Sequence, residues 1–307
     1  MGSHERPIES MNPSNQTTLR GIALMMFAML LFPFLDVLAK KLGQQGLPIF
    51  ETVWARTFLG SVLCVPLLAG IEGRRALIPR NNVLNAARGL AIVLTTFFFF
   101  SAMKYQGVAE TLSIYFIQPI LVTALAPLLL REYVSWHRWA AVIVGFLGVM
   151  VIIRPGLIAF NPGTVLAFAS GLAAAAVVIL SRKLAGGSSA LANTFYTSLY
   201  GATLACLVML WQWQMPNVQQ WAMMFGVAII GTSCNFLIIK AFEYCEASML
   251  APIGYAEMIN ATLSGWYFFG DFPDVWTFVG LAVLVGAALF ASQREHTRVV
   301  EETPAQI

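Results

Sequence analysis

Apolar residues fill this chain in about ten runs of near 20 residues, separated by short polar turns. A helix needs roughly 20 apolar residues to cross a hydrocarbon core about 30 Å thick. Within that core a spanning segment must satisfy its backbone amides internally, as a helix does. The pattern therefore predicts an all-α polytopic membrane protein with ten transmembrane helices. The expected spans are 19–39, 48–69, 83–103, 107–129, 134–153, 162–181, 190–211, 221–240, 247–269 and 273–292.

Composition supports this class and excludes others. Hydrophobic residues make up 58% of the chain and charged residues 11%, whereas soluble domains carry about 25% charged residues. Polar residues gather at the two ends of the sequence. We expect a disordered N-terminal tail at 1–18 and a cytoplasmic C-terminal tail at 293–307. No basic, aromatic-interleaved patch suggests nucleic-acid binding. The expected partners are the lipid bilayer and a small-molecule substrate; the sequence sets no oligomeric state and is compatible with a monomer.

The lysines and arginines predict how the chain is oriented, because they concentrate in cytoplasmic loops. With the N-terminus inside, thirteen of the 18 fall at or near the cytoplasmic face, and four fall outside. The remaining one, Arg56, lies within the second span. An even number of spans then places both termini in the cytoplasm.

An internal repeat appears when the chain is shifted by 139 residues. Within residues 102–132, five of the 31 positions then meet an identical residue, and Glu132 meets Asp271. Each half holds five spans, and five is odd, so the second half is expected to insert upside down. Inverted repeats of this kind are a transporter architecture, with the substrate site near the midplane between the halves. The identical pairs are Ala102 and Ala241, Tyr105 and Tyr244, Ile114 and Ile253, Ile120 and Ile259, and Thr123 and Thr262.

The segment 97–153 carries a family pattern. Ala102 and Tyr105 close the third span, Pro119 lies in the middle of the fourth, and Glu132 closes it. With these residues the chain resembles the drug/metabolite transporter superfamily, specifically its EamA-type members with ten helices. The second half departs from the pattern at Asp271, where the family has glutamate, and at Met258, the counterpart of Pro119.

The resemblance covers two EamA-like five-helix repeats, 19–153 and 162–292. It implies secondary transport of small organic metabolites, commonly export, across the bacterial inner membrane. YddG-like amino-acid exporters are similar in length and layout.

Glu257 is the strongest candidate for a site residue. It lies near the centre of the ninth span, about 15 Å from either surface at 1.5 Å per residue, where an ionised carboxylate costs several kcal/mol. Its repeat counterpart is Gln118, at the centre of the fourth span. The functional interpretation puts both in a central cavity that binds a cation or a proton. The structural one is a protonated glutamate bonded to a neighbouring helix.

Two further charged residues lie in the outer halves of neighbouring spans. Asp36 and Arg56 are expected to form an ion pair, which would reduce the desolvation cost of each. The alternative is that Arg56 binds a substrate carboxylate. Arg88, near the cytoplasmic end of the third span, is expected to extend its side chain to the headgroups.

Other span residues suit a cavity for organic solutes. The aromatic candidates offer stacking or cation–π contacts, with packing as the alternative for each ring. Thr96 and Asn235 are related by the repeat and suit either pore lining or interhelical hydrogen bonds. Pro119 and Pro252 are hinge candidates, because proline frees a carbonyl within a helix. The aromatic candidates are Tyr115, Tyr196, Tyr200 and Tyr255.

Enzyme functions are not favoured. No histidine lies within a span, no P-loop or G-x-S-x-G pattern occurs, and the cysteines show no metal-ligand spacing, so no catalytic site, cofactor or metal is expected. The sequence favours a secondary transporter that exports amino acids, aromatic ones among them, or related metabolites by alternating access. The alternatives are transport of nucleotide-like, vitamin-like or drug-like solutes, and a non-transport membrane scaffold.

The charge distribution generates a prediction about topology. Reporter fusions at the N-terminus and at the C-terminus should both score cytoplasmic, because the basic loops remain on that side. A periplasmic score at either end would contradict the even number of spans and the inverted repeat derived from it.

Overall fold

The computed structural model describes residues 13–71, 81–130, 136–153, 161–184, 188–209, 213–244, 250, 253, 256–283 and 285–287. Within these ranges every regular element is helical, which confirms the all-α class. The helices are α1 (Pro13–Gln44), α2 (Ile49–Ile71), α3 (Asn82–Ala102), α4 (Val108–Tyr115), α5 (Gln118–Leu129), α6 (Trp136–Ile153), α7 (Pro162–Leu184), α8 (Ala190–Met209), α9 (Val218–Tyr244) and α11 (Ala256–Phe269).

The helix lengths agree with a membrane protein. Among the described residues, five helices are long and apolar enough to span a bilayer, and two shorter apolar helical segments, Glu110–Leu125 and Val275–Ala287, accompany them. The full count of ten spans stays a prediction, because parts of the ninth and tenth expected spans lie outside the described residues. The five long helices cover Leu19–Gln44, Ile49–Gly70, Asn82–Ala102, Pro162–Leu184 and Val218–Tyr244.

The two predicted tails stay predictions. Helix α1 begins at Pro13, within the stretch 1–18 that was expected to be a tail. The fixed φ of proline and its missing N–H suit the first turn of a helix. Residues 1–12 and the whole of the 293–307 tail lie outside the described residues.

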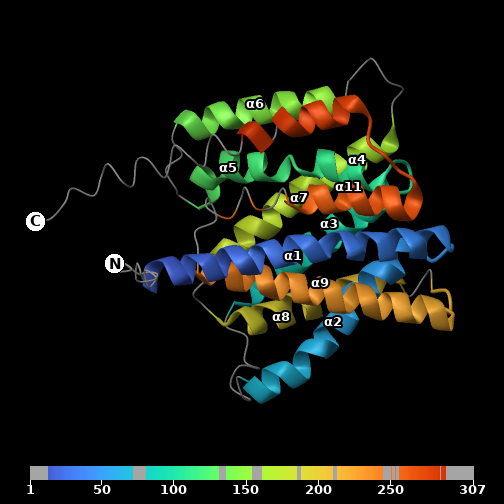
Figure 1. Ribbon diagram of the computed structural model, residues 1–307. Helices are drawn as coiled ribbons and strands as arrows, with labels where there is room; N and C mark the ends of the chain where they lie inside the picture. The colour runs from blue at the N-terminus through green and yellow to red at the C-terminus, as the bar shows by residue number, and fades with distance from the viewer. Residues whose placement is uncertain are drawn as a thin grey trace, which may run out of the picture.

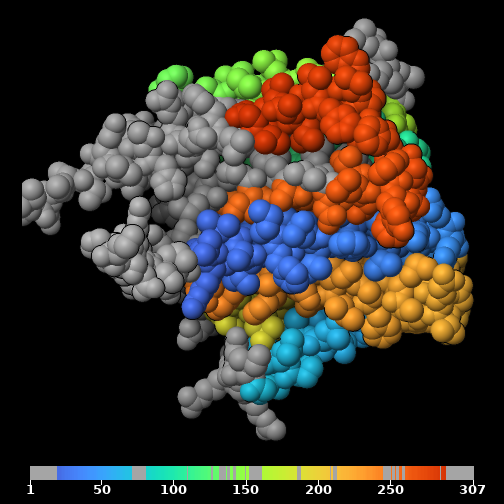
Figure 2. Space-filling view, viewed as in Figure 1, coloured from blue at the N-terminus to red at the C-terminus, as the bar shows by residue number. Residues whose placement is uncertain are grey.

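Large apolar side chains cover the outside of the bundle. Along α1, Phe27, Leu30 and Phe34 are exposed, and Figure 2 shows this helix lying open between α9 and α11. In water such a surface would drive aggregation. In hydrocarbon it costs nothing, so the surface itself indicates a lipid environment.

The fourth expected span is broken. Helix α4 ends at Tyr115 and α5 begins at Gln118, so the expected span 107–129 is interrupted next to the hinge candidate Pro119. Pro119 accounts for the break, because it has no N–H to donate to the Tyr115 carbonyl one turn earlier. That carbonyl packs closely on α7 instead: a Cβ added to Gly171 would lie 2.9 Å from it.

The two halves run in opposite directions. Lys40, near the end of α1, forms an ion pair with Asp271, which packs beside Gly107 at the start of α4. The neighbouring Tyr105 carbonyl accepts a hydrogen bond of 3.4 Å from the Asn161 amide, just before α7. The end of α1 and the start of α7 therefore lie at the same end of the bundle, called here the outer end; α1 begins at the inner end.

Helix neighbours also exchange under the 139-residue shift, which relates α1 to α7, α2 to α8, α3 to α9 and α5 to α11. Helix α1 packs on α9, and α7 packs on α3 (Figure 1). Likewise α2 packs on α9 and α8 on α3, while α1 contacts α11 and α7 contacts α5. The repeat seen in the sequence is thus a repeat of packing, and each half completes the environment of the other.

Candidate functional site

The centre of the candidate site is the Arg56 guanidinium on α2. Its Nη1 donates a 2.7 Å hydrogen bond to Thr96 Oγ1 on α3, while its Nε is buried without a partner. The side chain lies against the backbone of α9, where a Cβ on Gly231 would come within 3.0 Å of Nε. Glycine at 231 therefore permits the close approach. The Arg56 guanidinium is held in one direction, and its Nε–H donor has no hydrogen-bond partner.

Two carboxylates face this cation from other helices. Asp36 on α1 is 4% exposed and Glu257 on α11 is 8% exposed, and both lie within electrostatic range of Arg56 and of each other. The expected ion pair between Asp36 and Arg56 is not formed, since no N···O distance falls within 4.0 Å. Arg56 turns to Thr96 instead, so neither acid is neutralised by direct contact.

Glu257 occupies a distinctive place in the chain. It lies in the first turn of α11, as its repeat counterpart Gln118 begins α5. The free N–H groups of a helix N-terminus favour a negative charge there, typically by 0.3–1 kcal/mol. Within the described residues no hydrogen bond joins the Glu257 carboxyl to a neighbouring helix. The structural interpretation, a protonated glutamate bonded to such a helix, therefore finds no bonding partner among those residues.

Aromatic rings border the charged cluster. Tyr115, at the end of α4, lies within electrostatic range of Arg56 and Glu257 and packs edge-on against Phe99 with ring centroids 5.4 Å apart. Phe99 is one helical turn from Thr96 on α3. The cluster therefore combines charge with a ring face of the kind that cation–π binding uses.

The structure brings together Arg56, Thr96, Tyr115 and Glu257 from the predicted set. It also adds Cys234 of α9, which lies within electrostatic range of the two acids and Arg56 and whose Sγ contacts the Ala28 carbonyl at 3.5 Å. Sequence reasoning considered the cysteines as possible metal ligands; the one available signal was that Cys234 adjoins Asn235, which was already a candidate.

Other predicted residues lie elsewhere or act locally. Asn235 donates to the Gly231 carbonyl of its own helix at 3.0 Å, and its role in lining a pore stays a prediction. Tyr196 and Tyr200 form a ring pair on α8, and Tyr200 packs against Gly89 of α3. Gln118 is partly buried, with no hydrogen bond to the Arg56 cluster among the described residues. Tyr255 and Pro252 lie outside those residues.

Arg88 does not extend to the headgroups. It is 2% exposed and among the largest fully buried side chains. Its Nε donates to Ser181 Oγ on α7 at 2.8 Å, and its Nη1 donates to Thr197 Oγ1 on α8 at 3.0 Å. The prediction failed because hydroxyls on two neighbouring helices offer the guanidinium partners inside the protein.

Contacts between the halves also lie at the outer end. Lys40 of α1 pairs with Asp271, which follows α11, and the Lys40 ammonium lies 4.6 Å from the centre of the Phe269 ring. Both interactions cross from the first half to the second.

With this geometry in place, comparison with known proteins identifies the class. The description "EamA-like transporter family" fits residues 19–154 and again 161–293, and the chain belongs to that family. The double match agrees with the two repeats. The fold is shared with a solved crystal structure at a TM-score of 0.66 and 19% identity, covering 91% of this chain and 97% of the other.

Two curated relatives carry more particular descriptions. The S-adenosylmethionine uptake transporter of Rickettsia prowazekii is 27% identical over 91% of this chain and 95% of its own length. The riboflavin transporter of Vibrio cholerae is 27% identical over 90% of this chain and 94% of its own. Both are transporters, and neither description mentions amino-acid export.

The separation of Asp36 from Arg56 generates a prediction. Arg56→Gln should lower the yield of folded protein, because two buried acids lose the one cation near them among the described residues, and an unpaired buried charge costs about 3–5 kcal/mol. Adding Asp36→Asn should restore yield and melting temperature in detergent but not transport. Full recovery of transport in the double variant would instead show that the two residues act only as a structural pair.

Proposed function

We propose that this protein carries a cationic organic solute with an aromatic base, S-adenosylmethionine or a compound of the same chemistry, across the membrane by alternating access. The single observation that carries the proposal is the buried cluster of two carboxylates around one guanidinium, contributed by both repeats. With all three groups ionised, the cluster holds one negative charge in excess. A bound cation would balance it.

The chemistry of S-adenosylmethionine fits each part of the cluster. Its sulfonium is a positive charge that cannot be lost to a base, so Asp36 and Glu257 can attract it without transferring a proton. Tyr115 supplies a ring beside the two acids, and a desolvated cation over such a ring gains about 2 kcal/mol. Thr96 holds the Arg56 guanidinium near the two acids. There the positive charge of Arg56 offsets the repulsion between the two carboxylates.

The proposed movement follows from the position of the cluster between the halves. Asp36, Arg56, Thr96 and Tyr115 belong to the first repeat, whereas Glu257 belongs to the second. When the repeats rock against each other, the acids separate or approach, and the site faces one side or the other. The break between α4 and α5, with Pro119 in the first turn of α5, supplies a hinge beside Tyr115.

Direction and location belong to the proposal as well. The relatives support uptake of a nucleotide-like or vitamin-like solute over amino-acid export. We place the protein in the bacterial inner membrane with both termini cytoplasmic. Riboflavin, named for the other relative, suits the aromatic rings but is uncharged, so it offers the two carboxylates no opposite charge.

Uptake into proteoliposomes tests this function. Labelled S-adenosylmethionine should enter in a saturable way that unlabelled sulfonium compounds inhibit. Glu257→Gln should reduce uptake at least about tenfold, because a charge-assisted contact worth about 1.5–3 kcal/mol is lost. The matched control is Glu243→Gln, which makes the same change at an exposed glutamate paired with Lys240 and should leave uptake unchanged.

Two results would count against this assignment. Uptake of riboflavin without uptake of S-adenosylmethionine would replace the cationic solute by a vitamin-like one. Equal uptake by the wild type and Glu257→Gln would remove the acid cluster from the site.

A further inference from the structure

A second buried polar group lies away from the Arg56 cluster, at the inner end where α3 meets α7 and α8. Arg88 and Asn85 lie on α3, Ser181 on α7, and Asn193 and Thr197 on α8. On α3, Arg88 is eight residues before Thr96, which places it about 12 Å nearer the inner end at 1.5 Å per residue. This group, called the inner polar junction, is distinct from the central cluster.

Within the part of the chain that the structure describes, the junction holds a cation without a counter-charge. Ser181 and Thr197 bind Arg88 through neutral hydroxyls, and no carboxylate lies within ion-pair distance of it among the described residues. Thr197 Oγ1 is in turn directed to Asn85 Oδ1, at 3.3 Å. A guanidinium has five N–H donors, and two are used here. Three donors on a buried positive group therefore remain for something else.

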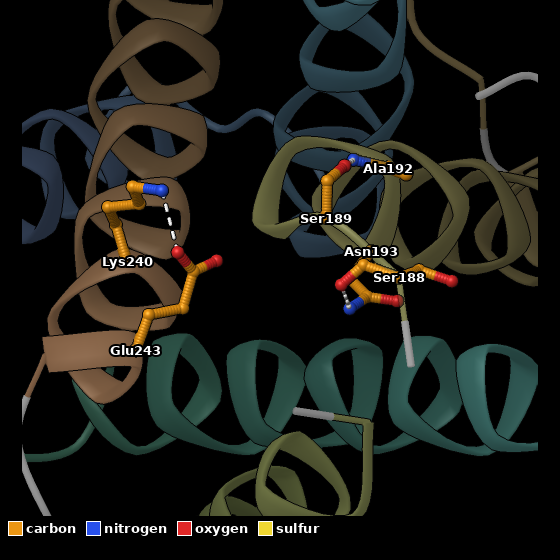
Figure 3. Close-up of polar contacts among 6 residues, drawn as sticks. All are labelled: Ser188, Ser189, Ala192, Asn193, Lys240 and Glu243. Atoms are coloured by element: carbon orange, nitrogen blue, oxygen red, sulfur yellow. Dashed lines mark hydrogen bonds and ion pairs between the residues drawn. The ribbon is translucent and has the colours of Figure 1, made fainter. Parts of the chain in front are cut away.

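An acceptor without a partner lies one turn away. Asn193 is 2% exposed, and its Nδ2 donates to the Ser188 carbonyl at 3.3 Å, as Figure 3 shows. Its Oδ1 is buried with no hydrogen-bond partner. Four residues separate Asn193 from Thr197, so both lie on one face of α8. The junction thus presents spare donors and a spare acceptor together.

Packing does not require these polar residues. Under the 139-residue shift, Asn85, Arg88 and Ser181 correspond to Met224, Val227 and Leu42, each fully buried. The related junction of α1 and α9 is therefore closed with apolar side chains. Since the same arrangement of helices is stable without a charge, and an uncompensated buried charge is costly, the inner polar junction calls for a ligand.

We infer that the inner polar junction binds the α-amino-acid group of a solute, with its carboxylate on Arg88 and its ammonium on Asn193 Oδ1. The carboxylate neutralises the guanidinium through charge-assisted hydrogen bonds, and the ammonium satisfies the free amide oxygen. Because Arg88 belongs to the first repeat and Asn193 to the second, the ligand bridges both halves at the inner end. Binding of the amino-acid group at the junction does not depend on the proposed function. Only the identity of the remainder of the solute rests on it.

Binding to the purified protein tests the junction without any assumption about transport. L-Methionine should raise the melting temperature of the wild type in detergent, whereas its decarboxylated analogue, 3-(methylthio)propylamine, should not. Arg88→Gln should abolish the shift, and Asn193→Leu should weaken it. Arg182→Gln is the matched control. It removes a positive charge from the residue that follows Ser181 on α7, and L-methionine should still raise the melting temperature of this variant.

The same comparison in uptake links the junction to the transported solute. Unlabelled S-adenosylmethionine should inhibit uptake of the labelled compound at least about tenfold better than its decarboxylated analogue, and Arg88→Gln should reduce that preference to about one. If Arg88→Gln does not fold, Thr197→Val, which removes one bond that positions the guanidinium, should reduce the preference in part.

Each result decides one of the two ideas. No shift with L-methionine in the wild type, or a shift that survives in Arg88→Gln, would overturn the inner site. An unchanged preference in Arg88→Gln or Thr197→Val would do the same. Absence of S-adenosylmethionine uptake with the L-methionine result intact would overturn the proposed solute and leave the inner site standing.

Discussion

The absence of water from the hydrocarbon core is the constraint on which the rest of this structure depends. Backbone amides must be bonded within each helix, and charged groups must find partners inside the protein. The protein meets the second demand by turning its charged side chains toward the interface between the two halves. Arg56, Asp36 and Glu257 gather at its centre, Arg88 lies at its inner end, and Lys40 lies at its outer end. The lipid-facing surface is left to apolar side chains.

The two repeats share their packing but not their chemistry. Helix neighbours exchange under the repeat, yet the polar groups do not: Arg88 corresponds to Val227 and Pro119 to Met258. Packing therefore preserves the symmetry of the repeat, and single residues break it. In consequence different interactions join the helices at the two ends, hydroxyl bonds to Arg88 at the inner end and the Lys40–Asp271 ion pair at the outer end.

The sequence predicted the fold class and the repeat, because hydrophobic run length and a fixed offset depend only on residue order. It singled out Glu257 and Arg56 as candidates because a charge within an apolar run stands out. It could not predict which partners they would choose. Asp36 looked like the partner of Arg56, yet Thr96 on α3 holds the guanidinium, since that choice depends on how three helices cross. The burial of Arg88 was missed for the same reason: Ser181 and Thr197 are distant in sequence and unremarkable in composition.

The central claim is that the charged cluster between the repeats becomes reachable from both sides of the membrane. Cys234 is a native reporter, because it is buried beside Arg56 and the two acids. Cys64 is an equally buried comparison that packs with Leu68 and Leu191 away from the cluster. Each should be kept as the sole cysteine and exposed, in oriented vesicles, to a membrane-impermeant thiol reagent from one side at a time. The account predicts labelling of Cys234 from both sides, slowed by solute, and none of Cys64; labelling of Cys234 from neither side, or from one side only, would contradict it.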